Sequence, residues 1–449
     1  MGGRGRVPTR GPAARCSKQG RHKGTGEVFR EGEKAMNRKV STALVSIVGI
    51  VALIAVLVPA PVAQQPEPVK IGVIIGLTGA AAVAGNDSYK AMQLAVEEIN
   101  RAGGVLGRRL ELVVQDDEGR PKSGVEAANK LADVDKVAAV VGGYQSSIAL
   151  PVGQVLNKKG VVFVTDATTN DLKKVGPYVF DTAGLAEQAV ALVDFVKIEK
   201  PSAKRLAGLF PNNPIGQDRA KVSEARVKQL GLAWVHTTLN QIGGKDFRAE
   251  LQILMAAKPD VILTDLYEGD LQIIQRQLFE MGVSDFSLFY SYNLSAYTTL
   301  EPKLIEGIKG LSYATTGARA AAFTQRYIAK YGKVYTDAWA PPFYDAVWIV
   351  ARAIAQANSL DRRKVRDAMW PAAYNYLGVS GAGDKGFNMW GKQAADQHVQ
   401  VVFRNGKMED YFTPGSKNNV VEFRYPGPEG EPLQFAPSED EFKKMYPGN

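Results

Sequence analysis

The sequence predicts an α/β protein built as two lobes, each a doubly wound parallel sheet. Short apolar runs rich in β-branched residues, which are typical of buried strands, alternate with longer segments of helical periodicity. This alternation begins near residue 69 and restarts between residues 178 and 188. Two late segments of helical periodicity, 320–331 and 338–358, have apolar faces that need a sheet to cover, so we expect the chain to return to the first lobe.

The first lobe is predicted to contain four strands with helices between them. A loop of small residues, 77–85, follows the first strand, and the helix after it is expected to open on the polar run Asn86-Asp87-Ser88. The predicted strands are 69–76, 109–115, 137–141 and 161–164, and the other two helices run over 121–132 and begin at the serines 146 and 147.

The second lobe shows the same alternation of strands and helices. Its predicted strands are 205–210, 233–238, 261–265, 286–290 and 310–314, and its predicted helices are 216–230, 246–257 and 270–281. From residue 413 onward Pro, Gly and charged residues dominate without periodicity, which predicts a loosely packed tail over 413–449.

Composition excludes several classes of function. With 45% apolar and 22% charged residues the chain is globular, and 449 residues suffice for two or three domains. The formal charge is +9, but residues 1–39 hold 11 Lys or Arg against three Glu, which leaves 44 basic and 43 acidic residues from residue 40 onward. We therefore expect no nucleic-acid partner. A single cysteine, Cys16, and three histidines predict neither a disulfide in the body nor a metal site, and we expect no cofactor.

The N-terminal region predicts export. Two basic residues precede the apolar run 43–58 and small residues follow it, which predicts a signal peptide over 36–63 with cleavage after Ala63. The leader 1–35 is crowded with Gly, Arg and Pro, and we expect translation to begin at Met36. The apolar run is short for a membrane span, but an uncleaved anchor is the open alternative. The expected location is the periplasm, with or without that anchor.

Polar loops follow the third and fourth predicted strands. They are Gly-Gly-Tyr-Gln-Ser-Ser at 142–147 and Thr-Asp-Ala-Thr-Thr-Asn at 165–170. Because ligands of open α/β sheets lie outside the carboxyl ends of the strands, we expect the two loops side by side around a ligand. A helix start at Ser146 offers free N–H groups, and the hydroxyls of Thr168 and Thr169 add donors, so the expected guest is a small carboxylate. Alternatively, the serines only cap the helix and the threonines only turn the chain.

Five stretches resemble the branched-chain amino-acid (Leu/Ile/Val) binding family, the extracytoplasmic solute-binding proteins of ABC importers. They are IGVIIGLTGAAAVAGND, LAVEEINRAGGVLGRRLEL, QDDEGRPKSGVEAANKL, VVGGYQSS and LFEMG, and the resemblance covers residues 69–412. It implies a type I periplasmic-binding fold, in which two lobes joined by three crossovers close on a ligand. The lobes are then expected to comprise 69–182 with 314–378, and 183–313 with 379–412. The implied partners are the ligand and an ABC permease and ATPase complex, and we expect a monomer.

The resemblance also assigns roles to individual residues. It aligns the family's carboxylate-holding serine with Ser146 and two further ligand contacts with Ala167 and Thr169. The family's second-lobe tyrosine aligns with Tyr267, and this ring, with Tyr290 and Tyr292, would offer aromatic walls with hydroxyl tips. The expected ligand-binding residues are Ser146, Ala167, Thr168, Thr169, Tyr144, Tyr267 and Tyr292.

This chain departs from the family's pattern in several places: aromatic residues of the family align near Ala84 and with Ile215, and two further departures concern a disulfide and a charge. The cysteine pair of the best-known members aligns with Gly119 and Gln145. The acidic residue that holds a ligand's ammonium group should lie at 291–293, where this chain has Ser-Tyr-Asn. Burying an ammonium without a counter-charge costs on the order of several kcal/mol, so we expect weak discrimination for an α-ammonium. Asp265 or Glu268 could substitute, although the alternative is that each is a solvated loop carboxylate.

The functional interpretation is extracytoplasmic capture of a branched-chain type amino acid, or a related small organic carboxylate, by hinge closure without chemistry. An enzyme is disfavoured, because the first loop does not fit G-x-G-x-x-G and the body has two histidines and no cysteine for catalysis. Two alternatives stay open. One is the ligand-sensing domain of a membrane-anchored receptor with the same fold, and the other is a binding protein for an aromatic acid or amide.

Overall fold

The computed structural model describes the chain from residue 66 onward, apart from several internal segments. The predicted leader, signal peptide and apolar run within residues 1–65 lie outside the described residues. Of the described helices, none is both long and apolar enough to span a bilayer. The described ranges are 66–182, 189–292, 294–313, 318–335, 339–374, 376–380, 395–412 and 420–424, together with positions 435, 437, 438, 440 and 441.

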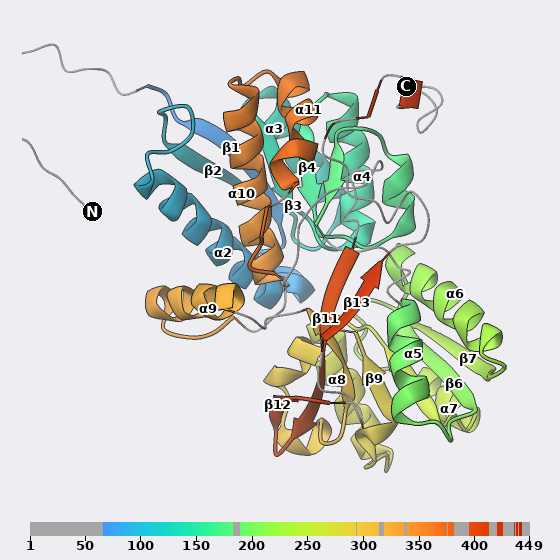
Figure 1. Ribbon diagram of the computed structural model, residues 1–449. Coiled ribbons are helices and arrows are strands. Elements are labelled where there is room, and N and C mark those ends of the chain that lie inside the picture. Colours follow the sequence, from blue (N-terminus) through green and yellow to red (C-terminus); the bar gives the residue numbers. More distant parts are fainter. Residues whose placement is uncertain are drawn as a thin grey trace, which may run out of the picture. The chain divides into compact units, whose positions relative to one another are not determined.

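The first sheet holds five parallel strands in the order β2-β1-β3-β4-β5 (Figure 1). β2 lies on one side of β1 and β3 on the other, so the winding of the sheet changes direction between β1 and β3. Each of the four predicted strands is present. The strands are β1 (Val69–Ile75), β2 (Leu110–Asp116), β3 (Ala139–Gly142), β4 (Val162–Thr165) and β5 (Val179–Asp181).

Helices cover both faces of this sheet. Successive side chains of a strand point to opposite faces, and in β1 the residues Ile71 and Val73 pack with α2, α10 and α11, whereas Ile74 packs with α3 and α4. The two late helical segments include α10, which therefore returns to this sheet as predicted. The helices are α2 (Ala82–Arg101), α3 (Pro121–Asp133), α4 (Ser146–Lys158), α10 (Ala340–Ala357) and α11 (Arg362–Ala373). This sheet and its helices are referred to as the first lobe.

The second sheet repeats the strand order of the first. Its parallel part runs β7-β6-β8-β9-β10, and β11 then pairs antiparallel with β10, β12 and β13. Helices α5 and α6 cover one face, and α7 and α8 the other. We refer to this sheet and its helices as the second lobe. Its elements are α5 (Ala189–Glu199), β6 (Arg205–Pro211), α6 (Pro214–Gln229), β7 (Ala233–Asn240), α7 (Arg248–Ala256), β8 (Val261–Thr264), α8 (Glu268–Glu280), β9 (Phe289–Ser291), β10 (Lys309–Tyr313), β11 (Ala395–Arg404), β12 (Lys407–Asp410) and β13 (Val420–Arg424).

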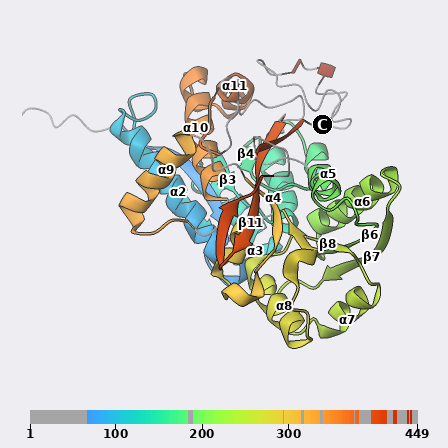
Figure 2. The same ribbon diagram turned by 60° about the horizontal axis from the view of Figure 1, so that its bottom comes forward.

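Helix α9 (Ala318–Tyr331), which follows the second-lobe strand β10, lies along α2 of the first lobe (Figure 2). Arg326 forms an ion pair with Glu98 at 2.7 Å, and the hydroxyl of Tyr331 donates to the carbonyl of Lys90 at 2.8 Å. These contacts attach the returning chain to the first lobe before α10 begins.

Asp345 of α10 fastens the segment 376–380 to the first lobe. Its carboxylate is fully buried and accepts hydrogen bonds from Tyr376 Oη at 2.9 Å, Val379 N at 2.9 Å, Ser380 N at 2.9 Å and Ser380 Oγ at 2.6 Å. Four donors satisfy a buried charge that would otherwise be strongly destabilising. The predicted boundary between the lobes falls within this anchored segment.

Two predicted element boundaries are wrong, the start of one helix and the start of one strand. The helix expected from residue 86 begins at Ala82, preceded by a short turn of 3₁₀ helix, η1 (Gly79–Ala81). Small residues pack there against the end of β1, where a Cβ at Gly85 would lie 1.8 Å from the carbonyl oxygen of Gly76. The expected strand 286–290 is shortened to β9, because Asp285 accepts from Ser287 N at 3.0 Å and holds residues 286–288 in a 3₁₀ turn.

The segment 413–449, predicted as a loosely packed tail, contains the strand β13. It pairs with β11 over five residue positions, so this part of the tail extends the second sheet. Helices α5 and α11 and strands β5, β11 and β12 were also not predicted. β11 is apolar at Val401 and Phe403, which join the second-lobe core, but it lies beyond a long stretch without periodicity.

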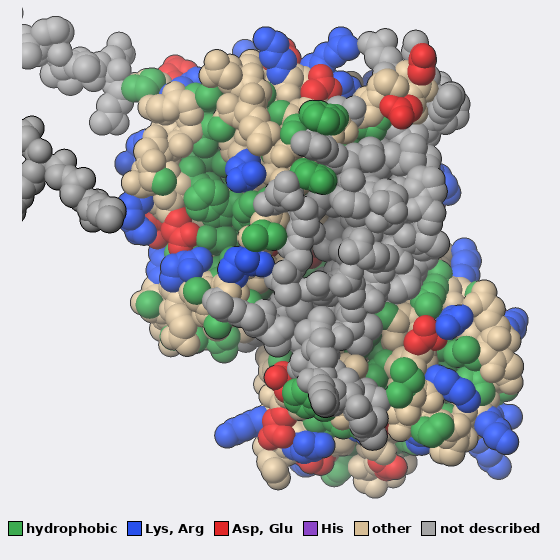
Figure 3. Space-filling model, viewed as in Figure 1, with side chains coloured by type: hydrophobic (Ala, Val, Ile, Leu, Met, Phe, Trp, Pro, Cys, Tyr) green, Lys and Arg blue, Asp and Glu red, His purple; other side chains and the backbone are tan. Residues whose placement is uncertain are grey.

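Charge on the surface is mixed. On the face shown in Figure 3, basic and acidic side chains of the described residues are interspersed, and no continuous basic patch is visible among them. This distribution agrees with the near-neutral composition of the chain from residue 40 onward.

Candidate functional site

Both sheets change winding direction at corresponding strands. In the first sheet this happens between β1 and β3, and in the second between β6 and β8. The crevice outside the carboxyl ends of the strands at such a point is the usual ligand position in open α/β sheets. Tyr144 and Ser146 follow β3, and Tyr267 follows β8, so three predicted site residues lie at the two switch points.

The two polar loops of the first lobe lie side by side, as predicted. The hydroxyl of Thr165, the last residue of β4, donates to the carbonyl of Gly143 in the loop after β3 and accepts from the N–H of Ala167 at 3.3 Å. Gly142 has a φ of 136°, and a Cβ there would lie 2.0 Å from the carbonyl oxygen of Ile74 in β1. Only glycine permits this close approach of the loop to the neighbouring strand.

Ser146 is the first residue of α4, and its hydroxyl is buried. Gln145 occupies the N-cap position and makes no capping hydrogen bond through its side chain. Ser146 is 0% exposed, and its Oγ has no hydrogen-bond partner among the described residues. The alternative that this serine only caps the helix therefore does not hold. A buried hydroxyl without a partner beside the free N–H groups of a helix start is an arrangement that accommodates an anion.

Aromatic side chains from both lobes meet at Tyr144, two residues before Ser146 in the chain. The ring of Tyr144 stacks on Trp339, with centroids 5.3 Å apart and planes at 18°, and faces Tyr267 of the second lobe at 6.4 Å. The Tyr144 hydroxyl donates to the carbonyl of Ala81 at 3.2 Å. Tyr267 accepts from Asn213 Nδ2 at 2.9 Å, and burial raises the pKa of its hydroxyl well above the ordinary range, so Tyr267 stays neutral.

The loop after β4 places its hydroxyls differently from the prediction. Ala167 and Thr168 are buried, and Thr169 is fully buried. The hydroxyl of Thr169 accepts from Asp171 N at 3.5 Å and donates to Asp218 Oδ2 at 2.8 Å. Its single proton is thus directed to a carboxylate of the second lobe.

The second lobe contains a buried arginine, Arg219, next to the loop that follows β8. Arg219 of α6 is 3% exposed, lies 3.9 Å from the ring centroid of Tyr292 and pairs with Asp265 at an Nε to Oδ2 distance of 3.4 Å. Burial raises the pKa of the Asp265 carboxyl, and the positive charge of Arg219 opposes that shift. The ring of Tyr292 thus packs against the guanidinium group of Arg219. Tyr290 instead packs edge-on against Phe195 in the core.

Asp265 and Glu268 are not solvated loop carboxylates. Only 21% of the Asp265 side chain is exposed, and Glu268, in the first turn of α8, is 7% exposed. Asp270 is also buried and accepts from Asn240 Nδ2 at 3.0 Å and from Gly243 N at 2.9 Å. Among the described residues, no group of three or more His, Cys, Asp or Glu side chains is arranged to hold a metal ion.

The sequence profile of the periplasmic binding protein family matches residues 68–402. The chain belongs to this family. Within it, the Leu/Ile/Val-binding protein homolog 3 of Brucella melitensis biotype 1 is 32% identical over 302 residues, which are 65% of this chain and 80% of that protein. This places the chain among the Leu/Ile/Val-binding proteins, a family of substrate-binding proteins rather than enzymes.

Solved structures share the fold of this periplasmic binding protein. The branched-chain amino acid transporter substrate binding protein LivJ from Streptococcus pneumoniae, in complex with isoleucine, superposes with a TM-score of 0.70 at 24% identity, over 79% of this chain and 99% of that one. A solute binding protein from Rhodopseudomonas palustris BisB5, in complex with 3,4-dihydroxy benzoic acid, gives a TM-score of 0.67 at 18% identity, over 80% and 97%. The predicted type I periplasmic-binding fold is confirmed.

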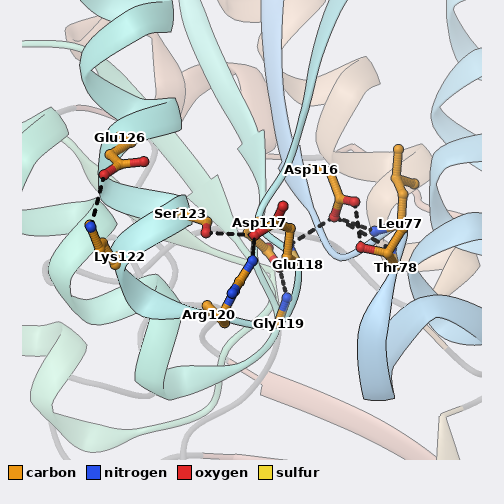
Figure 4. Close-up of polar contacts among 10 residues, drawn as sticks. All are labelled: Leu77, Thr78, Asp116, Asp117, Glu118, Gly119, Arg120, Lys122, Ser123 and Glu126. Atoms are coloured by element: carbon orange, nitrogen blue, oxygen red, sulfur yellow. Dashed lines mark hydrogen bonds and ion pairs between the residues drawn. The ribbon is translucent and has the colours of Figure 1, made fainter.

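An acidic turn after β2 shapes the first loop of this family member (Figure 4). Asp116 accepts from Leu77 N at 2.9 Å and from Thr78 Oγ1 at 2.7 Å, which ties the loop after β1 to the end of β2. Asp117 is buried beside it and accepts from Gly119 N at 2.8 Å. Burial raises the pKa of Asp117 to about 6, although the Gly119 N–H favours the charged form.

The structure also brings together the two positions aligned with the family's cysteine pair. A Cβ at Gly119 would lie 3.8 Å from Gln145 Oε1, so the two chain segments are neighbours. The expected ammonium-holding position is only partly described, because Asn293 lies outside the described residues, while Ser291 and Tyr292 are buried.

Three residues at the site were not predicted from the sequence: Asp218, Arg219 and Trp339. Arg219 did carry a signal, because it falls on the buried stripe of α6 between Ile215 and Val227, where an arginine without a partner would be very unfavourable. Asp218 and Trp339 carried none, since their partners lie far away in the sequence.

Proposed function

We propose that this protein captures a small organic carboxylate, an amino acid of the branched-chain type or a related acid, between its two lobes and delivers it to an ABC permease and ATPase complex. The observation that carries the proposal is the buried hydroxyl of Ser146 at the start of α4, which has no hydrogen-bond partner within the described ranges. A carboxylate there would accept from that hydroxyl and from helix N–H groups, and the helix dipole would stabilise its charge. The Leu/Ile/Val-binding relatives and the isoleucine complex support an amino-acid ligand.

Aromatic acids are the second candidate ligands. The stacked rings of Tyr144 and Trp339, facing Tyr267, form an aromatic wall suited to a flat ring, and a structural relative binds 3,4-dihydroxy benzoic acid. Both candidates share one carboxylate, so they use the same subsite at Ser146.

Binding is proposed to close the two lobes over the ligand. Contacts from both lobes at the site, such as Tyr144 with Tyr267, favour the closed arrangement when the ligand adds contacts to each lobe. Small-angle scattering should then show compaction at saturating ligand, and an unchanged radius of gyration would contradict closure.

We further propose that the precursor starts at Met36 and is exported. A fusion starting at Met36 should reach the periplasm with processing near Ala63. Retention of that fusion in the cytoplasm would contradict the proposal, and an exported but unprocessed product would indicate a retained anchor.

Native mass spectrometry of freshly purified protein, followed by calorimetry with leucine, isoleucine and benzoate, tests the ligand class. Ser146→Ala should weaken binding of the acid by about ten- to hundredfold, because one hydrogen bond to a charged group contributes about 1.5–3 kcal/mol. Thermal stability should change little, since no described residue forms a hydrogen bond with this hydroxyl. Ser147→Ala, at the neighbouring, partly exposed position, is the matched control and should bind like the wild type. Equal affinity of Ser146→Ala and wild type would overturn the assignment.

A further inference from the structure

One carboxylate of the protein itself occupies the polar loop after β4. Asp218 of α6 reaches from the second lobe, and its Oδ2 accepts from Thr169 Oγ1 at 2.8 Å and from Asn170 N at 3.0 Å. A hydroxyl and a backbone N–H that converge on one oxygen form the kind of donor pair that binds a carboxylate. Lys174 of the first lobe adds a favourable electrostatic interaction with Asp218.

The donors at this place are already in use. A threonine hydroxyl has one proton, and Thr169 gives it to Asp218 while its oxygen also accepts from Asp171 N. Thr169 therefore has no proton to give to a bound acid in this arrangement. Ser146, by contrast, has no partner among the described residues. The donors of the loop after β4 are thus occupied by a carboxylate of the chain, whereas the hydroxyl at the start of α4 is not.

We infer that the Thr169–Asn170 loop is a carboxylate-binding subsite occupied intramolecularly by Asp218. Its occupant joins the lobes and keeps a second acidic group of a ligand out of the site. The carboxylate of a ligand with one acidic group is then bound at Ser146 and not at Thr169. The occupation of this loop by Asp218 rests on contacts within the chain, whereas the binding of a ligand at Ser146 alone rests on the proposed function.

The direction of Asp218 follows from its neighbour in α6. Arg219 points into the second lobe, where it pairs with Asp265 and stacks on Tyr292. Successive helix residues lie about 100° apart around the axis, so a buried Arg219 turns Asp218 away from its own lobe. Among the described residues, both hydrogen bonds to the Asp218 carboxylate come from the first lobe.

Removing the carboxylate should leave a subsite that a free small carboxylate can fill. We expect Asp218→Ala to have a larger radius of gyration than the wild type in small-angle scattering without ligand. Sodium acetate should restore compaction saturably, and at tenfold above its dissociation constant it should raise the melting temperature by about 2–4 °C. Sodium chloride at equal ionic strength should do neither. The wild type should lack the part of this response that Asp218→Ala gains, and Ser146→Ala alone, which keeps Asp218 but loses the proposed ligand hydroxyl, should show no response.

Two further variants locate the response. Asp218→Ala with Thr169→Val should lose it, because the hydroxyl donor is gone, whereas Asp218→Ala with Ser146→Ala should keep it, because the ligand subsite is separate. Asp194→Ala removes an acid that pairs with Arg226 inside the second lobe and should give no acetate response. An acetate response equal in wild type and Asp218→Ala, or none in Asp218→Ala, would overturn the inference. If Asp218→Ala does not fold, Thr169→Val alone should expand the protein, and an unchanged radius of gyration would overturn it equally.

Discussion

The two lobes share one strand order but present different chemistry at the site. At the first-lobe switch point the hydroxyl of Ser146 is buried and has no hydrogen-bond partner in the described part of the chain. At the second-lobe switch point the polar groups are paired with each other, as in Arg219 with Asp265 and Asn213 with Tyr267. Under the proposed function, the first lobe binds the ligand's carboxylate at Ser146, whereas these polar residues of the second lobe stabilise one another. Substitution of Ser146 should therefore affect binding, whereas substitution of a paired second-lobe residue such as Arg219 should affect folding stability.

The largest effect is expected from breaking the second-lobe pair. Arg219→Met leaves Asp265 mostly buried without its cation, which should lower the free energy of unfolding at pH 7 by about 3–5 kcal/mol in urea denaturation. Removing both partners, Arg219→Met with Asp265→Leu, should recover most of that loss, because no uncompensated charge is left buried.

Arg226→Met is the matched control on the same helix. Arg226 pairs with Asp194 at 2.7 Å, but both side chains are about one third exposed, so the loss should be about 1 kcal/mol or less. Equal losses for Arg219→Met and Arg226→Met would show that the buried pair has no special role in the stability of this lobe.

The sequence predicts much of this difference between the lobes, though not all. Periodicity locates the strands and their two faces, since burial on a face requires apolar residues at fixed spacing. The first-lobe subsite is predictable because its parts, the loop after β3 and the start of α4, are adjacent in the chain. The partner of Thr169 is not, because Asp218 lies on another lobe and its contact depends on how two sheets are placed. Likewise Arg219 is recognisable as unusual, but Asp265 is not recognisable as its partner.

The next effect compares two acids that directly follow strands, Asp117 after β2 and Asp265 after β8. Asp265 has a cation beside it, whereas among the described residues the Asp117 carboxylate accepts from the Gly119 N–H and has no cation paired with it. Burial raises the pKa of Asp117 to about 6. A raised folded-state pKa means that the folded protein binds more protons than the unfolded chain between about pH 4 and pH 6. The contribution of Asp117 to stability is therefore full below pH 4 and is lost as the pH rises through 6.

Asp117→Asn removes this dependence and keeps an acceptor for Gly119 N. Relative to the wild type, the variant should gain nothing at pH 4 and about 3 kcal/mol at pH 7, measured by urea denaturation across pH. Asp246→Asn is the control, because Asp246 is exposed and the N–H of Arg248 lowers its pKa. Its stability difference should not grow with pH in favour of the amide. A pH-independent gain for Asp117→Asn would place the cause outside the titration of this carboxyl.

The smallest expected effect concerns a ligand's ammonium group. This is the part of the ligand that the second lobe would have to bind. Calorimetry of leucine against its deaminated 2-keto acid should give affinities within about threefold of each other, or less than about 1 kcal/mol. The reason is that Asp265 already has its charge compensated by Arg219, while the neighbouring Ser291 and Tyr292 are neutral. An ammonium beside a neutral pair gains little against its loss of hydration. If leucine bound tenfold or more tightly and this preference disappeared in Asp265→Asn or in Glu268→Gln, the named carboxylate would be the ammonium partner, and the second lobe would read the ligand after all.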